Sequence, residues 1–181
     1  MMMAGMMIMP SSGDMALPPL TEADLSMLLA HHASTARLNA RLENWADRLP
    51  DRPDASEALL LCEALSAYVD KRAADQAALW QALHCYPAHD SLPHTMLAYL
   101  QSCDTATTGI ADSLLEVLDP GAGGNGRAWP CAEALGFMFR CFFENCRHLL
   151  AVEILAILLL GADRLTLGAR RLLESRLALS A

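Results

Sequence analysis

The sequence predicts an all-α protein: an up-down-up-down antiparallel four-helix bundle followed by a short C-terminal helix. Four long segments repeat their apolar residues with the period of a helix, and proline and glycine separate them. No segment alternates apolar and polar residues as a half-buried strand does. Short connections join the segments, and long helices joined by short connections pack as antiparallel neighbours.

The first two helices have boundaries marked by capping and breaking residues. We expect the first to span residues 21–49, because Thr21 and Asp24 have the spacing of a capping box and Pro50 follows the last turn. The second is expected over residues 54–84, since an aspartate with a glutamate three positions on precedes its apolar pattern.

The remaining helices are also delimited by local signals. A third helix is expected over residues 91–118, where an Asp-Pro-Gly turn ends it. A fourth is expected over residues 130–160, with Gly161 as its stop signal. A shorter helix over residues 166–179 completes the chain and is expected to cap one end of the bundle.

Most of the chain is expected to form one domain. Its 181 residues are enough to bury a substantial core, and 54% of them are apolar. We expect residues 20–181 to form the bundle and residues 1–19, which are rich in methionine, to be a flexible leader. That leader lacks the basic start and long apolar core of a secretory signal. The six cysteines include no CxxC pair, which favours a reducing compartment and therefore the cytoplasm.

Charge and motifs exclude several classes of function. A net charge of −8 without a basic patch argues against a nucleic-acid partner. The sequence has no polybasic amphipathic segment for a membrane surface, and its longest apolar run is about half the length that a bilayer requires. It also lacks a nucleophile elbow, a P-loop and a dinucleotide fingerprint, so we do not expect an enzyme.

Each long helix nevertheless places an ionisable residue on its apolar face. A helical wheel with 100° per residue places His32, Asp104 and Glu153 on the apolar faces of the first, third and fourth helices. In the second helix, Lys71 and Asp75 both fall within the apolar stripe. In an antiparallel bundle these residues lie roughly 15 Å from the same end, so they predict one polar layer. Isolated buried charges are costly, and such a layer needs metal, internal pairing or water.

At these residues the sequence resembles the hemerythrin-like, HHE cation-binding family. The resemblance covers the chain from about Leu20 to Leu177 and is carried by four stretches: LLAHH at 28–32, AALWQAL at 77–83, LAYLQSCD at 97–104 and HLLAVEILAILLLGADRLT at 148–166. It implies a di-iron four-helix bundle that binds oxygen or senses iron, oxygen or nitric oxide. The implied metal ligands are His32, Asp75, Asp104, His148 and Glu153.

The chain departs from the family pattern at several of these positions. The HxxxE pair of the second helix falls on Lys71 and Asp75, so a lysine stands where a histidine ligand is expected. Asp104 stands where the first histidine of the third helix belongs. His148 and Glu153 fit the HxxxxD spacing of some members, but the helical wheel puts His148 on a flank, and a π-bulge would be needed to bring both inward.

Two functions therefore stay open. The first is a non-haem protein with an altered site for one or two iron ions, with a diatomic gas as a further ligand. The second is a metal-free descendant that serves as an interaction or structural module. In it, Lys71 is the buried counter-charge of Asp75, Asp104 and Glu153. His32 is a metal ligand if the site holds metal, and otherwise a core histidine that is hydrogen-bonded to Asp75 or Asp104.

The aromatic residues of the fourth helix also allow two interpretations. Because this helix is apolar over much of its circumference, they belong either to the core or to a homodimer contact. The residues concerned are Phe137, Phe139, Phe142 and Phe143.

Overall fold

The computed structural model describes residues 19–51, 54–83, 91–119 and 130–180, except for the side chains of 73–83, 91–93 and 179–180. Nearly all of these residues are helical, which confirms the predicted all-α class. The five helices are α1 (Glu22–Arg48), α2 (Ala55–Leu83), α3 (Ser91–Leu118), α4 (Ala132–Leu160) and α5 (Leu167–Ser180). None of the described helices combines the length and the apolar character needed to cross a membrane. The predicted leader lies outside the described residues, apart from its last position.

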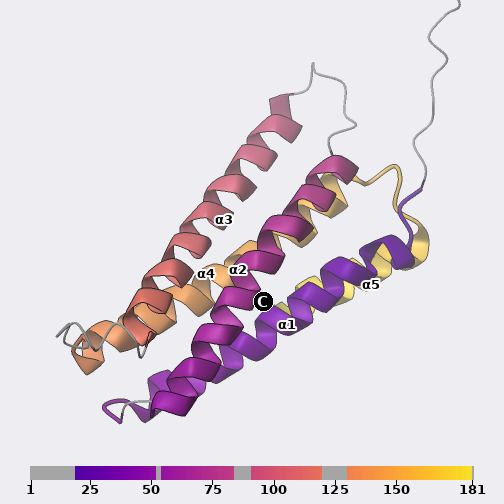
Figure 1. Ribbon diagram of the computed structural model, residues 1–181. Helices are drawn as coiled ribbons and strands as arrows, with labels where there is room; N and C mark the ends of the chain where they lie inside the picture. Colours follow the sequence, from indigo (N-terminus) through magenta and orange to yellow (C-terminus); the bar gives the residue numbers. More distant parts are fainter. Residues whose placement is uncertain (1–18, 52–53, 84–90, 120–129, 181) are drawn as a thin grey trace, which may run out of the picture.

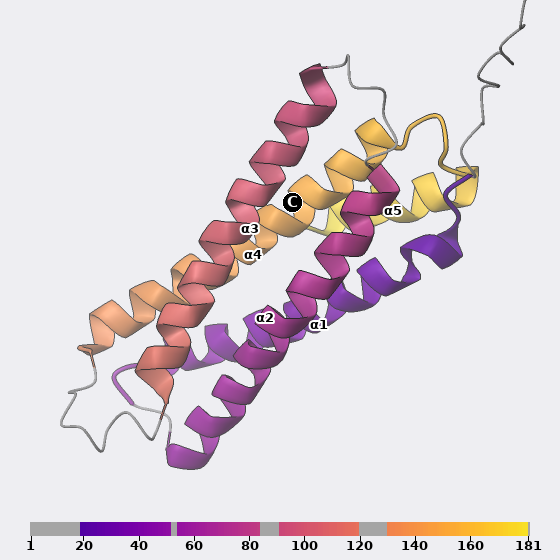
Figure 2. The same cartoon turned by 45° about the horizontal axis from the view of Figure 1, so that its top comes forward.

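The four long helices surround a common interior (Figure 1). Each of them packs against two others: α1 and α3 both contact α2 and α4. The short helix α5 packs against α4 and α1, as the view in Figure 2 also shows. These contacts are those expected of a helix bundle.

The helices begin and end within two residues of the predicted boundaries. Thr21 caps α1 and forms the predicted capping box: its backbone N–H donates to Asp24 Oδ2 at 2.8 Å, and the Asp24 N–H donates to Thr21 Oγ1 at 3.4 Å. Asp54 precedes α2, and its Oδ1 accepts a hydrogen bond from the Glu57 N–H at 2.9 Å. Local capping chemistry therefore places the starts of both helices.

A short backbone bridge anchors the start of α1 to the turn between α4 and α5. The Leu20 N–H donates to the Arg164 carbonyl at 2.7 Å, and the Thr166 N–H donates to the Leu20 carbonyl at 3.0 Å. Leu20 and Leu165 are thereby paired. The turn begins at Gly161, where α4 ends as predicted; a Cβ atom there would lie 2.7 Å from the Ile157 carbonyl oxygen, so glycine fits best.

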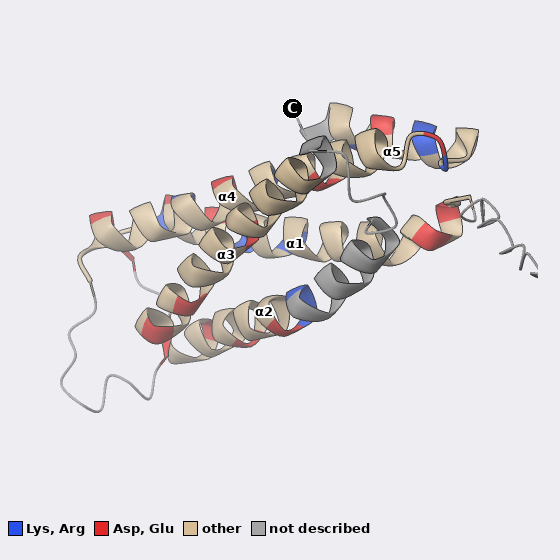
Figure 3. Cartoon of the chain, turned by 90° about the horizontal axis from the view of Figure 1, so that it is seen from above, with Lys and Arg blue, Asp and Glu red and all other residues tan. Residues whose placement is uncertain are grey.

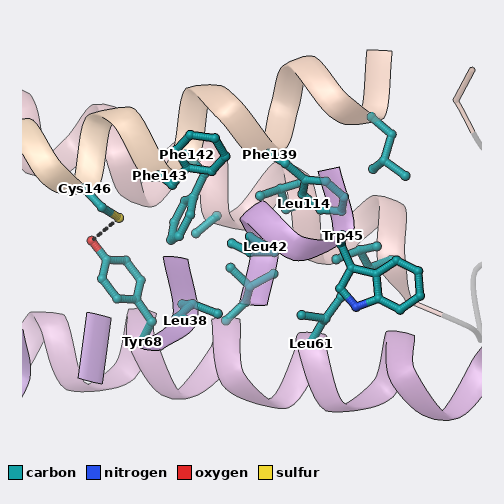
Figure 4. Close-up of a cluster of buried hydrophobic side chains, with 14 residues drawn as sticks. Leu38, Leu42, Trp45, Leu61, Tyr68, Leu114, Phe139, Phe142, Phe143 and Cys146 are labelled. Atoms are coloured by element: carbon teal, nitrogen blue, oxygen red, sulfur yellow. Dashed lines mark hydrogen bonds between the residues drawn. The ribbon is translucent and has the colours of Figure 1, made fainter. Parts of the chain in front are cut away.

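The largest apolar cluster joins the four long helices (Figure 4). Its members are Leu38, Leu42, Trp45, Leu61, Leu65, Tyr68, Ala111, Leu114, Leu118, Leu135, Phe139, Phe142, Phe143 and Cys146. Three of the four phenylalanines of α4 thus belong to the core, whereas Phe137 is 64% exposed. Burial raises the pKa of the Cys146 thiol to about 12, and the thiol donates to the Tyr68 hydroxyl at 3.8 Å. A thiol that stays protonated in the core is a structural residue rather than a nucleophile.

Candidate functional site

One buried ion-pair network connects all four long helices. It consists of His32 from α1, Arg72 from α2, Asp104 from α3 and Glu153 from α4, and we call it the Arg72 cluster. All four residues are buried; Arg72 is only 3% exposed and Glu153 only 2%. The structure thus brings together three of the four residues that were predicted to converge on one layer, His32, Asp104 and Glu153, whereas the side chain of the fourth, Asp75, lies outside the described residues.

The guanidinium of Arg72 lies between the two carboxylates. Its Nε donates to Asp104 Oδ1, and its Nη2 donates to Glu153 Oε1. The second oxygen of Glu153 is 3.0 Å from His32 Nε2. Because an ionised carboxylate can only accept, the His32 Nε2 carries the proton of this hydrogen bond.

Helix α3 cannot neutralise its own buried carboxylate. It contains acidic residues but no lysine or arginine, as its lack of blue segments in Figure 3 illustrates. The positive partner of Asp104 must therefore come from a neighbouring helix, and Arg72 of α2 supplies it. Arginine suits this position because its planar group offers donors to two carboxylates at once.

The network determines the charge states of its members. Burial alone raises the pKa of Glu153, but the hydrogen bond from His32 and the charge and hydrogen bond of Arg72 outweigh burial and hold the pKa below its ordinary value. Burial alone lowers the pKa of Arg72, but the charge and hydrogen bonds of Glu153 and Asp104 raise it above its usual range. The cluster thus contains an ionised Glu153 and a permanently charged Arg72.

The prediction that Lys71 is the buried counter-charge is wrong. Lys71 is exposed, and the next residue, Arg72, takes the buried position. Neighbouring residues of a helix point about 100° apart, so a shift of one residue exchanges a buried side chain for an exposed one. The buried series Leu61, Leu65 and Tyr68 has spacings of four and three, and its continuation by four reaches Arg72. That spacing is the signal that identifies the arginine.

Of the two further predicted ligands, His148 lies away from the cluster and the side chain of Asp75 is not described. His148 is exposed on the flank of α4, where its Nε2 lies 2.7 Å from the Tyr99 hydroxyl. The side chain of Asp75 lies outside the described residues. His32, for which Asp75 or Asp104 was the expected hydrogen-bond partner, instead bonds to Glu153.

A second buried histidine was missed by the sequence analysis. His31, which the helical wheel places well to one side of the apolar face, is 1% exposed. Its ring stacks on Tyr68 of α2 with centroids 5.9 Å apart, and its Nε2 lies 3.4 Å from Thr35 Oγ1. Because α1 packs against both α2 and α4, two adjacent histidines are buried against different neighbours.

The described residues do not fit the metal centre that the family resemblance implies. Imidazole and carboxylate groups are suitable iron ligands, but the guanidinium of Arg72 already binds both described carboxylates. An arginine does not deprotonate in proteins, and its charge repels a cation placed beside it. Within the described part of the chain, no group of three or more His, Cys, Asp or Glu residues is placed to hold a metal ion.

The lowered pKa of Glu153 predicts a loss of stability in acid. The contribution of Glu153 is fully present above its ordinary pKa of 4.5, and it is lost as the pH falls from there through the lower folded-state pKa. Urea unfolding at a series of pH values should show the free energy of unfolding falling across this interval. The Glu153→Gln variant should be less stable at neutral pH and have a shallower acid dependence. If the free energy of unfolding fell equally with pH in both proteins, Glu153 would not be the source of the acid dependence.

Comparison of the chain with models of known families, with characterised proteins and with solved structures gives no match. The geometry of the Arg72 cluster and the surfaces of the bundle are the features of the chain that bear on its function.

Proposed function

We propose that this chain is a metal-free bundle of the hemerythrin-like type that acts as an interaction or structural module. The observation that carries the proposal is the position of Arg72, whose guanidinium binds two buried carboxylates from two other helices. In this arrangement the side chain supplies the positive charge that a metal ion would otherwise bring. A buried hydrogen-bonded ion pair can also fix the register of the helices that it joins.

The proposal includes an up-down-up-down course for the four long helices. It is supported by the short connection between α1 and α2 and by the closed ring of contacts in which α1 also packs against α4. Helices joined by few residues pack most readily as antiparallel neighbours. The ribbon in Figure 1 is compatible with this course.

An interaction role is supported by large apolar side chains on the surface. Apolar side chains that adjoin one another on a surface are typical of contacts with other proteins, whereas single ones occur on any surface. The large apolar side chains exposed here are those of Met27, Leu59, Leu60, Tyr99, Phe137, Leu155, Leu159 and Leu167. Three of them lie on α4, so we propose α4 as the homodimer contact, which gel filtration with light scattering would test.

Iron analysis tests the metal-free assignment. Protein purified after iron supplementation should contain no stoichiometric iron, should lack the visible absorption of an oxo-bridged pair, and should melt at the same temperature with and without a chelator. The reason is electrostatic: Arg72 already neutralises the carboxylates that would bind the metal. Two irons per chain with an oxo-bridge band would overturn the proposal and favour the metal-binding function.

A variant provides the positive control for this experiment. Arg72→His places a neutral imidazole, a good ligand, among His32, Asp104 and Glu153. Titration with Co²⁺ should give tetrahedral d–d absorption for this variant but not for the wild type. Lys71→His, which adds the same ligand at the exposed neighbouring position, is the matched control and should behave like the wild type.

A further inference from the structure

A pocket opens between α1 and α2, separate from the Arg72 cluster. Its volume is about 230 Å³. Three basic side chains line it, Arg37 and Arg41 from α1 and Lys71 from α2. All three residues are exposed. Because Arg37 and Arg41 are one helical turn apart, they lie on the same side of α1.

Among the described residues, the three cations of this pocket have no acidic partner. The described residues that line it include no aspartate or glutamate, and the ion pairs between described residues do not include Arg37, Arg41 or Lys71. In a protein with a net charge of −8, three such cations around one hollow make a local site of opposite sign.

The neighbouring depression on α1 provides a contrast. It shares Arg41 with the pocket but is also lined by Arg48 and Glu57. There the Arg48 guanidinium lies 3.6 Å from a Glu57 carboxylate oxygen and 4.0 Å from the centroid of the Trp45 ring. The charge of Arg48 is thus already paired within the protein, so the pocket around Lys71 is the better site for an external anion.

The rest of the pocket is partly apolar and partly hydroxylic. Tyr68 lines it together with Ala64 and Ala67, whose small side chains leave the space open. Ser34, Thr35 and His31 also line it. The lining thus combines cations, hydroxyl-bearing residues and small apolar side chains, which is the mixture typical of small-molecule sites.

We infer that this pocket binds a small organic phosphate monoester. The phosphate dianion would lie between Arg37, Arg41 and Lys71, because arginine offers paired donors to phosphate oxygens and lysine a point charge. The apolar part would lie against Ala64 and Ala67. It must be compact, since the volume is below the range of drug-sized ligands. This inference does not depend on whether the bundle holds a metal.

Calorimetric titration of the full chain with phenyl phosphate tests the inference. We expect saturable binding that is tighter than that of inorganic phosphate or benzyl alcohol, which each supply only one half of the ligand. The double variant Arg37→Gln/Arg41→Gln should weaken phenyl phosphate binding about tenfold or more, because it removes charge-assisted hydrogen bonds. The matched control Arg140→Gln/Arg171→Gln removes the same charge from exposed positions on α4 and α5 and should leave binding unchanged.

A second variant tests the location independently of charge. Ala67 is exposed, so Ala67→Leu should leave the fold intact while filling the pocket, and phenyl phosphate binding should be lost. Circular dichroism verifies the helical content of every variant. The inference would be overturned if the two double variants weakened phenyl phosphate binding equally. It would also be overturned if benzyl alcohol bound as tightly as phenyl phosphate, or if the Ala67→Leu variant bound phenyl phosphate as the wild type does.

Discussion

Replacing Arg72 with methionine is expected to lower the free energy of unfolding by about 3–5 kcal/mol. The methionine retains much of the apolar stem but leaves the carboxylates of Asp104 and Glu153 without the guanidinium that pairs with them. A buried carboxylate that loses this guanidinium is either left without sufficient compensation or must take up a proton, and both outcomes cost stability. Urea unfolding at neutral pH, analysed with a constant denaturant slope, measures the loss.

Lys71→Met is the matched control for this experiment. It makes the same chemical change at the adjacent position of the same helix, but Lys71 is exposed, so the free energy of unfolding should change by only about 0.5 kcal/mol. Equal losses for the two variants would mean that Arg72 is not the main counter-charge of the buried carboxylates. A loss for Arg72→Met that disappears when metal is added would indicate that the site accepts a cation once the arginine is gone.

Phe142→Ala is expected to have a loss of similar size, about 3–5 kcal/mol. Phe142 is completely buried, and its ring meets Tyr68 edge to face with centroids 5.3 Å apart (Figure 4). The substitution removes a large apolar group and leaves a cavity that the surrounding helices can only partly fill. Thermal and urea unfolding should both report the loss.

Phe137→Ala separates the effect of burial from that of the residue type. Phe137 is on the same helix but is 64% exposed, so its removal should change the free energy of unfolding by about 0.5 kcal/mol or less in the monomer. If α4 forms the proposed homodimer contact, the same variant should instead weaken dimerisation in gel filtration. A stability loss comparable to that of Phe142→Ala at low protein concentration would contradict the placement of Phe137 on the surface.

The helices could be predicted closely because their ends depend on nearby residues. The capping box of Thr21 and Asp24 and the stop at Gly161 act through bonds within one helical turn, which the sequence displays directly. The assignment of buried faces depends instead on packing between helices. It succeeded for Asp104, which is one turn after the buried Leu100, and for Glu153, which is one turn after the buried Leu149.

The buried face of α2 could not be predicted with the same accuracy. This helix is rich in alanine, which is found at both buried and exposed positions, so its apolar stripe is broad and a shift of one residue is hard to detect. Lys71 and Arg72 also carry the same charge, and composition alone does not distinguish them. His31 was missed for a different reason: burial on two sides of α1 follows from contacts with both α2 and α4, which only the packed structure reveals.

The backbone bridge between Leu20 and Leu165 can form only late in the synthesis of the chain. Leu20 precedes all four long helices in the sequence and Leu165 follows them, so the segment that leads into α1 acquires its backbone partner only after α4 has been made. Contacts between residues so far apart in sequence form slowly compared with the local turns of a helix. On the ribosome, α1 to α3 therefore have time to associate before the bridge closes, and its closure marks the stage at which the start of α1 is fastened to the finished bundle.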